Sequence, residues 1–266
     1  QDGPYSDRKA YDLVMQGETG LILMNGSPDA PAKVPLSICD INAGMFGALG
    51  AVNALYQRER TGEGQEIDLS MFGGMLSWLG YFPLQYIHDG QIPERVGMRH
   101  HILTPYGPHR TEDEQYINFA VLSDDHFEVF CEHVIERPDL LEDERFAGNE
   151  KRIENRDVFE PIIEEEIASQ PRDYWADRLE AAGLPWGDVN TLDDVVNHPV
   201  TDHLDMIRDL ETDEGPIEVI DNPLDMSESS LRCDTLPDLG QHSEQLLAEL
   251  GYSDEKIEKL AENGDI

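Results

Sequence analysis

The stretch VPLSICDINAGMFGALGAV, residues Val34–Val52, places a single aspartate, Asp40, between an apolar run and a series of small residues. A carboxylate in such a setting needs a partner, because burial of an unpaired charge is costly. Asp40 directly precedes INAG and is a candidate helix N-cap, whose side chain accepts hydrogen bonds from nearby backbone N–H groups. The start of a helix also keeps a carboxylate ionised and oriented, which suits a nucleophile. The local pattern favours the cap, and the two interpretations are compatible.

A helix rich in small residues is expected over Asp40–Arg60, with the turn sequence TGEG at its end. Ala43, Gly44 and Gly47 would leave room for a substrate to lie across this helix. The following residues, QEIDLS, are typical of a short strand, and a second apolar helix is expected over Met71–Ile87.

The middle of the chain, about Pro105–Asn197, is expected to form a smaller α+β domain. The segment EQYINFAVLS predicts a strand, because β-branched and aromatic residues dominate it. Helical patterns follow over about Asp124–Glu136, Asn149–Ser169 and Pro171–Ala182, the last of them ended by Gly183.

The charge of the chain is its most unusual bulk property. Its 266 residues include 56 acidic and 19 basic side chains, for a net charge of −37. Such a field repels nucleic acids and anionic membranes, so neither is an expected partner. The acidity is spread along the chain and only five of the cations are lysines, a composition that suits concentrated salt, where self-repulsion is screened. We therefore expect a halophilic source.

The three cysteines, Cys39, Cys131 and Cys233, show neither paired nor metal-type spacing, which indicates a reducing, cytoplasmic location without structural zinc. The longest apolar stretch, near Met71–Ile87, is interrupted by Gly, Pro and Gln, so no transmembrane span is predicted. The first residues lack both a signal-peptide pattern and an initiator Met, and the chain is expected to be a fragment of a longer protein.

Two further groups of residues are candidates for binding. In SDRKAYD, the adjacent Arg8 and Lys9 would suit the phosphates of a nucleotide-like ligand, or they would form a solvated pair that counters Asp7 and Asp12.

The histidines His100, His101 and His109 lie in a flexible segment without a carboxylate at the spacing that completes a metal site, so no metal is expected. The chain has no P-loop, glycine-elbow serine or dinucleotide fingerprint, and motifs alone leave the chemistry open.

Six segments in order, from Gln1 almost to Ile266, carry a resemblance to a known family. They are QDGPYSDRKAYDLVMQGETGLI, PAKVPLSICDINAGMFGALGAVNALYQRERTGEGQEIDLSMF, PYGPHRTEDEQYI, LEDERFAGNEKRIENRD, WADRLEAAGLPWGDVNTLDDVVNHP and LGQHSEQLLAELGYSDEKI. Together they resemble the class III CoA-transferase family, which includes formyl-CoA transferase, carnitine CoA-transferases and α-methylacyl-CoA racemase.

The resemblance implies an α/β fold of the interlocked-homodimer type, with a Rossmann-like large domain and an inserted small α+β domain. Residues 1–88 would be part of the large CoA-binding and catalytic domain, and residues 89–104 a linker and active-site loop. Residues 105–200 would form the small domain, and residues 201–266 would return to the large one. Family chains begin earlier, with a Rossmann-like portion that supplies much of the CoA pocket, so that portion is expected to be absent here.

The resemblance also implies a nucleophile. Asp40 matches the family's catalytic aspartate, which attacks the donor thioester to give a mixed anhydride and free CoA thiolate. The thiolate then forms an aspartyl-CoA thioester, and the acceptor acid completes the exchange. Covalent catalysis of this kind divides one difficult acyl transfer into easier steps.

The remaining site residues follow from the same resemblance. Arg8, Lys9, Ala10 and Tyr11 match a segment that contacts CoA in formyl-CoA transferase, and Met71 matches a position on the CoA thiol side. The racemases have a histidine where this chain has Tyr11. Because a phenol is a poor base at neutral pH, Tyr11 favours a transferase over a racemase.

We therefore predict an enzyme that moves CoA from an acyl-CoA donor to a carboxylic acid acceptor, without a metal or a permanently bound cofactor. Succinyl-CoA and a dicarboxylate such as mesaconate are the suggested pair. The alternatives are an acyl-CoA racemase or epimerase and a non-catalytic subunit of the same fold. The expected assembly is a homodimer.

Overall fold

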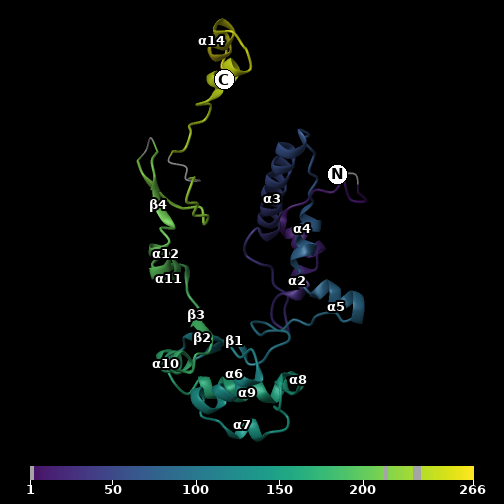
Figure 1. The fold of residues 1–266 in the computed structure, drawn as a ribbon, viewed down its shortest axis with the longest axis vertical. Helices are drawn as coiled ribbons and strands as arrows, with labels where there is room; N and C mark the ends of the chain where they lie inside the picture. The colour runs from purple at the N-terminus through teal and green to yellow at the C-terminus, as the bar shows by residue number, and fades with distance from the viewer. Residues whose placement is uncertain (1–2, 213–214, 230–234) are drawn as a thin grey trace. The chain divides into compact units, whose positions relative to one another are not determined.

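The structure is a computed structural model that describes residues 3–212, 215–229 and 235–266. The chain divides into two compact units, Gln1–Val189 and Asn190–Ile266, and each is described by itself. The first unit begins with helices and continues with a mixed α/β part, and the second contains short helices and one hairpin (Figure 1).

The first unit opens with five helices, and the first four of them contribute to a small apolar core. They are α1 (Asp12–Glu18), α2 (Leu21–Met24), α3 (Ile38–Thr61), α4 (Met71–Trp78) and α5 (Phe82–Asp89). Cys39, Met75 and Leu79 are buried where α3 and α4 meet, and Met15 of α1 packs against them. This cluster joins three helices that are separate in the sequence.

The helix α3 begins earlier than the sequence predicts and ends where expected. It starts at Ile38 and stops at Thr61, and Gly62 adopts the left-handed conformation (φ 77°) that commonly terminates a helix. Within the described residues, α3 is the one helix whose length and composition would also suit a membrane span.

Two expectations for the residues after α3 are wrong. The segment QEIDLS forms no strand, because no other strand of the described residues pairs with it. Its side chains Ile67 and Leu69 lie over Gly50 and Gly47 of α3. The single helix expected over Met71–Ile87 is two helices, α4 and α5, with a break at Gly80, whose φ is +64°.

The second part of this unit is an α+β structure with an antiparallel sheet in the order β1-β2-β3. The strands are β1 (Tyr106–Arg110), β2 (Tyr116–Ala120) and β3 (Trp186–Asp188). The helical elements are α6 (Asp124–Val129), the π-helix η1 (Phe130–Val134), α7 (Asp139–Glu142), α8 (Asn149–Glu154), α9 (Arg156–Ile167) and α10 (Arg172–Ala182). The predicted strand is confirmed as β2, and α10 ends at Gly183 (φ 67°) as expected.

The core of this α+β part is the most extensive buried cluster of the described residues. Phe130, Phe159 and Leu179 are fully buried beside Ile117 of β2, and Trp175 donates a hydrogen bond of 2.7 Å from its indole nitrogen to a backbone carbonyl. Alternating residues of β2 face this core, so the sheet and helices share one apolar layer.

The second unit contains short elements. They are α11 (Leu192–Val196), α12 (Pro199–His203), β4 (Ile207–Leu210), β5 (Ile217–Ile220), α13 (Ser243–Glu249) and α14 (Asp254–Glu262). The strands β4 and β5 form an antiparallel pair. Because both sheets are antiparallel, the described residues contain no Rossmann-type parallel sheet.

The α+β core should dominate the stability of the first unit. Replacement Phe159→Ala should lower its free energy of unfolding by about 3–5 kcal/mol, since the aromatic ring is fully buried and leaves a cavity. Ile92→Ala, at a position 77% exposed in the same unit, should change stability by less than about 0.5 kcal/mol. Chemical denaturation in concentrated KCl measures both. Similar losses for the two variants would contradict this assignment of the core.

Candidate functional site

Asp40 occupies the third helical position of α3, and the N-cap residue is Ser37. The N-cap interpretation of Asp40 is therefore wrong, because the helix begins two residues earlier and the N–H of Ile41 already bonds to the carbonyl of Ser37 at 3.0 Å. The Asp40 side chain is exposed in the first turn, where the helix dipole interacts favourably with a negative charge. The carboxylate is thus open to a reacting group.

The capping contact at this helix start comes from α1. Asp12 accepts a hydrogen bond of 2.9 Å from the backbone N–H of Cys39, through a carboxylate oxygen. Its other oxygen accepts a hydrogen bond of 2.7 Å from the Gln16 side chain. A carboxylate from a neighbouring helix therefore satisfies one of the free N–H groups at the start of α3.

Gln16 fixes the chain that leads into α3. Its side chain is fully buried, accepts a hydrogen bond of 2.9 Å from the Val34 N–H and contacts the carbonyls of Val34 and Leu36 at 3.1 and 3.3 Å. Asp12 and Gln16 thus hold the residues just before Asp40 from a single helix face. Sequence reasoning missed this role, and the Asp–x–x–x–Gln spacing was the signal for it.

Cys39, the residue directly before Asp40, has an unreactive thiol. Cys39 is fully buried, and burial together with the nearby Asp12 carboxylate raises the pKa of its thiol to about 11. The thiol stays protonated at neutral pH and does not act as a nucleophile. Cys131 is also buried, and burial raises the pKa of its thiol to about 12. Cys233 lies outside the described residues.

The predicted CoA contacts before α1 lie at the surface. Arg8, Lys9, Ala10 and Tyr11 are all exposed. The Arg8 guanidinium stacks on the Tyr5 ring, 4.2 Å from its centre, and a nitrogen lies 3.4 Å from a carboxylate oxygen of Glu18. The acidic contact of Arg8 is thus Glu18, and not Asp7 or Asp12 as the solvated-pair alternative expected.

Met71 is the first residue of α4 and lies against the apolar cluster that contains Cys39. The start of α4 is capped by Ser70, whose hydroxyl accepts a hydrogen bond of 3.0 Å from the Gly73 N–H. The structure therefore brings Met71 to the core beside the first turn of α3, while the role of Met71 in CoA binding stays a prediction.

The glycines near Asp40 have different surroundings. Leu69 lies over Gly47, so this glycine accommodates the chain itself, while a side chain at Gly44 would meet nothing within 4 Å. The closest approach is at Gly74 of α4, where a Cβ would lie 2.3 Å from the Asn42 amide oxygen. Asn42 is fully buried, so Gly74 lets α4 pack closely on α3 two residues after Asp40.

The three candidate histidines all pack against aromatic rings. His100 lies beside Tyr106, His101 beside Phe82, and His109 stacks on Phe119 with ring centres 4.6 Å apart. The residues that the structure describes hold no cluster of three or more His, Cys, Asp or Glu side chains suited to a metal ion.

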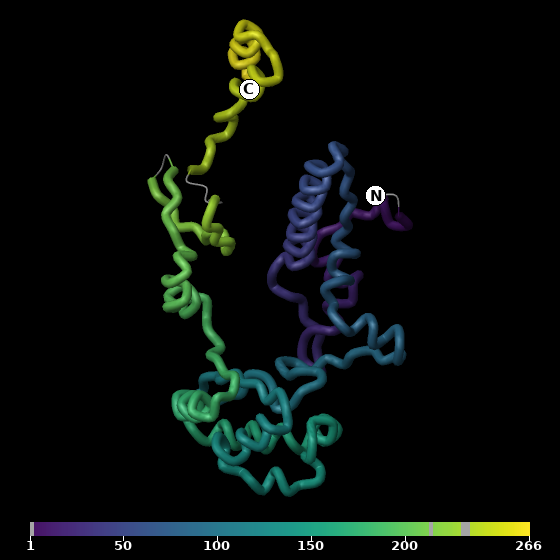
Figure 2. Tube along the Cα trace, in the orientation of Figure 1, coloured from purple at the N-terminus to yellow at the C-terminus, as the bar shows by residue number. Residues whose placement is uncertain are grey.

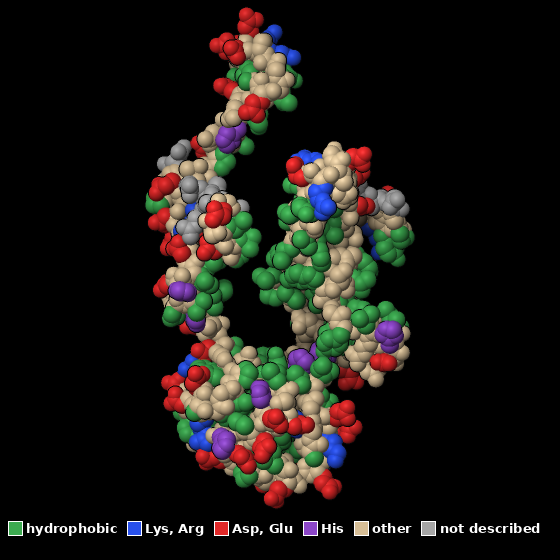
Figure 3. Space-filling view, in the orientation of Figure 1, with side chains coloured by type: hydrophobic (Ala, Val, Ile, Leu, Met, Phe, Trp, Pro, Cys, Tyr) green, Lys and Arg blue, Asp and Glu red, His purple; other side chains and the backbone are tan. Residues whose placement is uncertain are grey.

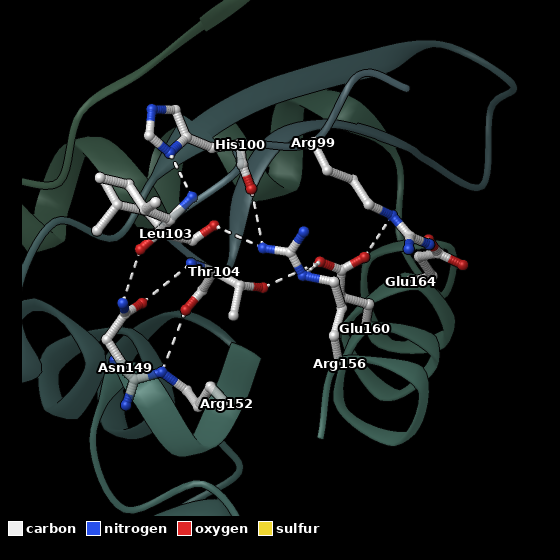
Figure 4. A network of polar contacts seen from close by, with 10 residues as sticks. Arg99, His100, Leu103, Thr104, Asn149, Arg152, Arg156, Glu160 and Glu164 are labelled. Atoms are coloured by element: carbon white, nitrogen blue, oxygen red, sulfur yellow. Dashed lines mark hydrogen bonds and ion pairs between the residues drawn. The ribbon is translucent and has the colours of Figure 1, made fainter. Parts of the chain in front are cut away.

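A buried carboxylate, Glu160 of α9, organises the segment that joins the helices to the sheet (Figure 4). It forms ion pairs with Arg99 and with Arg156, the latter at 3.1 Å, and accepts a hydrogen bond of 3.1 Å from the Thr104 hydroxyl. Burial raises the pKa of Glu160, and the two guanidinium groups oppose that rise.

The backbone of residues 100–104 is held by the same part of the chain. Arg156 donates to the carbonyl of His100 at 2.8 Å, and Asn149 donates to the carbonyl of Ile102 at 2.8 Å. The buried Arg152 donates to the carbonyl of Thr104 at 3.1 Å. These contacts satisfy carbonyl groups in a segment without regular secondary structure (Figure 2).

The preceding residues are anchored to the loop after α2. Arg95 donates to the carbonyls of Ser27 and Pro28, both at 3.0 Å, and the Gly97 N–H bonds to the carbonyl of Gly26 at 3.0 Å. The segment predicted as an active-site loop is therefore anchored on both sides, and its part in catalysis stays a prediction.

Comparisons with known proteins identify the relatives of this chain. It is 33% identical to acetyl-CoA:oxalate CoA-transferase of Acetobacter aceti over 85% of this chain and 57% of that protein. It is 32% identical to succinyl-CoA:mesaconate CoA-transferase of Haloarcula hispanica over 91% of this chain and 61% of that protein.

Solved structures are similar as well. A CAIB/BAIF family protein from Brucella suis aligns with a TM-score of 0.77 and 32% identity, over 93% of this chain and 65% of that chain. The orthorhombic form of Rv3272 from Mycobacterium tuberculosis aligns with a TM-score of 0.79 and 25% identity, over 91% of this chain and 64% of that chain.

The chain spans less than two thirds of the length of these relatives. Residues 1–243 match the model of CoA-transferase family III. The mixed α/β fold and the sequence thus agree, and the chain belongs to CoA-transferase family III.

Proposed function

We propose that the chain carries the nucleophile of a CoA-transferase that moves CoA from an acyl-CoA donor to a carboxylic acid acceptor. The observation that supports this most is the exposed carboxylate of Asp40 in the first turn of α3. Asp12 and Gln16 bond to the backbone of the residues that precede it. Family membership supports the class of reaction, and this geometry supports Asp40 as the reacting residue.

In the proposed reaction, an Asp40 oxygen attacks the thioester carbonyl, and the carbon–sulfur bond breaks to release CoA thiolate. The thiolate attacks the Asp40 carbonyl of the resulting anhydride, which releases the donor acid and leaves an aspartyl-CoA thioester. The acceptor carboxylate repeats the sequence in reverse and leaves as its CoA thioester. Each step exchanges one acyl bond for another, so no redox or metal chemistry is needed.

The protein's contribution to this chemistry is positioning. Asp12 and Gln16 fix the backbone just before Asp40, so the carboxylate reaches the thioester without a large loss of conformational entropy. The exposed Arg8 and Lys9 would bind the phosphates of CoA, because guanidinium and ammonium groups form strong hydrogen bonds to phosphate oxygens. Met71 would lie on the thiol side.

The proposed substrates are succinyl-CoA and a dicarboxylate such as mesaconate. The name of the Haloarcula hispanica relative supports this pair, and so does the acidic composition, which suits a halophile. We place the protein in the cytoplasm, where the buried Cys39 and Cys131 remain free thiols.

A homodimer is proposed on the basis of one exposed face of α3 (Figure 3). Five large apolar side chains follow one another at helical spacing and are each at least 46% exposed: Ile41, Met45, Leu49, Val52 and Tyr56. A contiguous apolar surface of this kind commonly marks a protein contact. In the proposed homodimer, a second copy of the chain packs against this face of α3 and buries these five side chains.

The variant Asp40→Asn should lose CoA transfer by about 10³-fold or more, because an amide is a poor nucleophile. The matched control is Asp7→Asn, which removes the same charge from an exposed position close to the predicted CoA contacts. CoA exchange between succinyl-CoA and mesaconate, followed by chromatography, measures both in the full-length protein. Full activity of Asp40→Asn would contradict the proposal, and α-proton exchange without an acceptor acid would favour a racemase.

The variant Asp12→Asn should weaken the contact that positions α3. We expect a loss of about 0.5–2 kcal/mol in stability, as for a lost helix cap, together with a lower kcat at an almost unchanged KM for acyl-CoA. Asp12→Glu, which keeps the carboxylate, should recover part of the rate. A rise in KM alone would contradict a positioning role.

Stability should rise with salt. Between about 0.2 and 2 M KCl the Debye length falls to a few ångströms, so repulsion among the 56 acidic side chains is screened. The midpoint of urea denaturation should move to higher urea over this range. Sucrose at equal osmolality serves as the uncharged control, and an equal effect of sucrose would contradict the electrostatic explanation.

A further inference from the structure

A cavity of about 440 Å³ lies beside the Glu160 network, away from the residues assigned to CoA. Its wall combines the 96–99 segment, the strand β1 and the helix α9. Residues with hydrogen-bond donors predominate among its polar residues: Arg99, Tyr106, His109, Arg110 and Tyr116. Apolar residues such as Val96, Met98 and Pro105 complete the wall.

Arg99 is the best-positioned of these donors. One edge of its guanidinium is held by the buried Glu160, and a second nitrogen lies 3.3 Å from a carboxylate oxygen of Glu164 (Figure 4). Glu160 is also bound to Arg156 and Thr104, whereas Glu164 is 54% exposed. A ligand carboxylate could therefore replace Glu164 on Arg99 and leave the buried ion pair intact.

His109 adds an uncharged aromatic ring to the cavity wall. Its Nε2 atom is buried and has no hydrogen-bond partner among the residues that the structure describes. Burial and the nearby Arg99 lower the pKa of His109 to about 4, so the imidazole is neutral at pH 7. Because Nε2 is closed off from the cavity, a ligand oxygen does not reach it, and the neutral ring neither adds to nor offsets the charge of Arg99.

We propose that this cavity binds a small carboxylate, most favourably a short dicarboxylate, with one carboxylate on Arg99. Arg110 at the exposed end of β1 is available to the second carboxylate, in exchange for its surface contact of 3.2 Å with Glu114. The methylene carbons would contact Val96, Met98 and Pro105. Binding is inferred from the cavity and from Arg99, independently of the proposed function.

Isothermal titration calorimetry of the chain with succinate, in KCl and without CoA, tests the proposal. Arg99→Gln should weaken binding by about tenfold or more, since a charge-assisted hydrogen-bond pair is lost. Glu164→Gln should strengthen it severalfold, because the competing carboxylate is removed. Glu165→Gln is the matched control: it removes the same charge from the next exposed residue of α9, outside the cavity wall, and should leave the affinity unchanged.

Arg99→Gln is expected to weaken succinate binding and Glu164→Gln to strengthen it. The test therefore stays decisive even if Arg99→Gln disturbs the fold, because a disturbed fold would not strengthen binding. Succinamide, which has the same carbon skeleton without charge, should not compete with succinate, and phosphate should bind more weakly. The proposal is overturned if wild-type protein does not bind succinate, if phosphate binds as tightly, or if Glu164→Gln and Glu165→Gln behave alike. Succinate binding by a protein that transfers no CoA would disprove the proposed function and leave this site standing.

Discussion

The hydrogen bond from the Cys39 N–H to the Asp12 carboxylate is the contact on which the proposed site depends. A helix start needs partners for its free N–H groups, and here the partner comes from a different helix. Because Gln16 binds both Asp12 and the chain before α3, the contact sets the position of the helix start as well as its capping. Asp40 therefore does not serve as the helix cap, and its side chain is exposed in the first turn of α3.

The first unit uses its polar groups in two different ways. Asp40 is exposed and available for chemistry, while Glu160 is buried among two guanidinium groups and a hydroxyl. A buried carboxylate with several fixed partners is costly to disturb, which suits a structural anchor. The anchor holds residues 100–104 and leaves one edge of Arg99 facing an open cavity. In the proposed site, structural and ligand-binding roles would thus be carried by neighbouring residues.

The sequence predicted correctly those elements that depend on interactions between residues close together in the chain. The strand β2 and the end of α10 at Gly183 follow from residue pattern and from the conformational freedom of glycine. The strand expected at QEIDLS is wrong because no strand of the described residues pairs with it, and the cap expected at Asp40 is wrong because α3 begins two residues earlier. Ile67 and Leu69 pack on glycines of α3, and Asp12 supplies the cap. Likewise, the Arg99–Glu160 pair joins residues that are far apart in the chain and had no local pattern to reveal it.

The proposed reaction requires that the Asp40 carboxylate becomes covalently acylated by the acyl-CoA donor. The most direct measurement incubates the full-length protein with succinyl-CoA, quenches with hydroxylamine and identifies modified peptides by mass spectrometry. Hydroxylamine converts an activated aspartyl group to a hydroxamate, so this mass change is expected on Asp40 and should be absent when acyl-CoA is omitted. A hydroxamate on another residue, or none during active turnover, would contradict it.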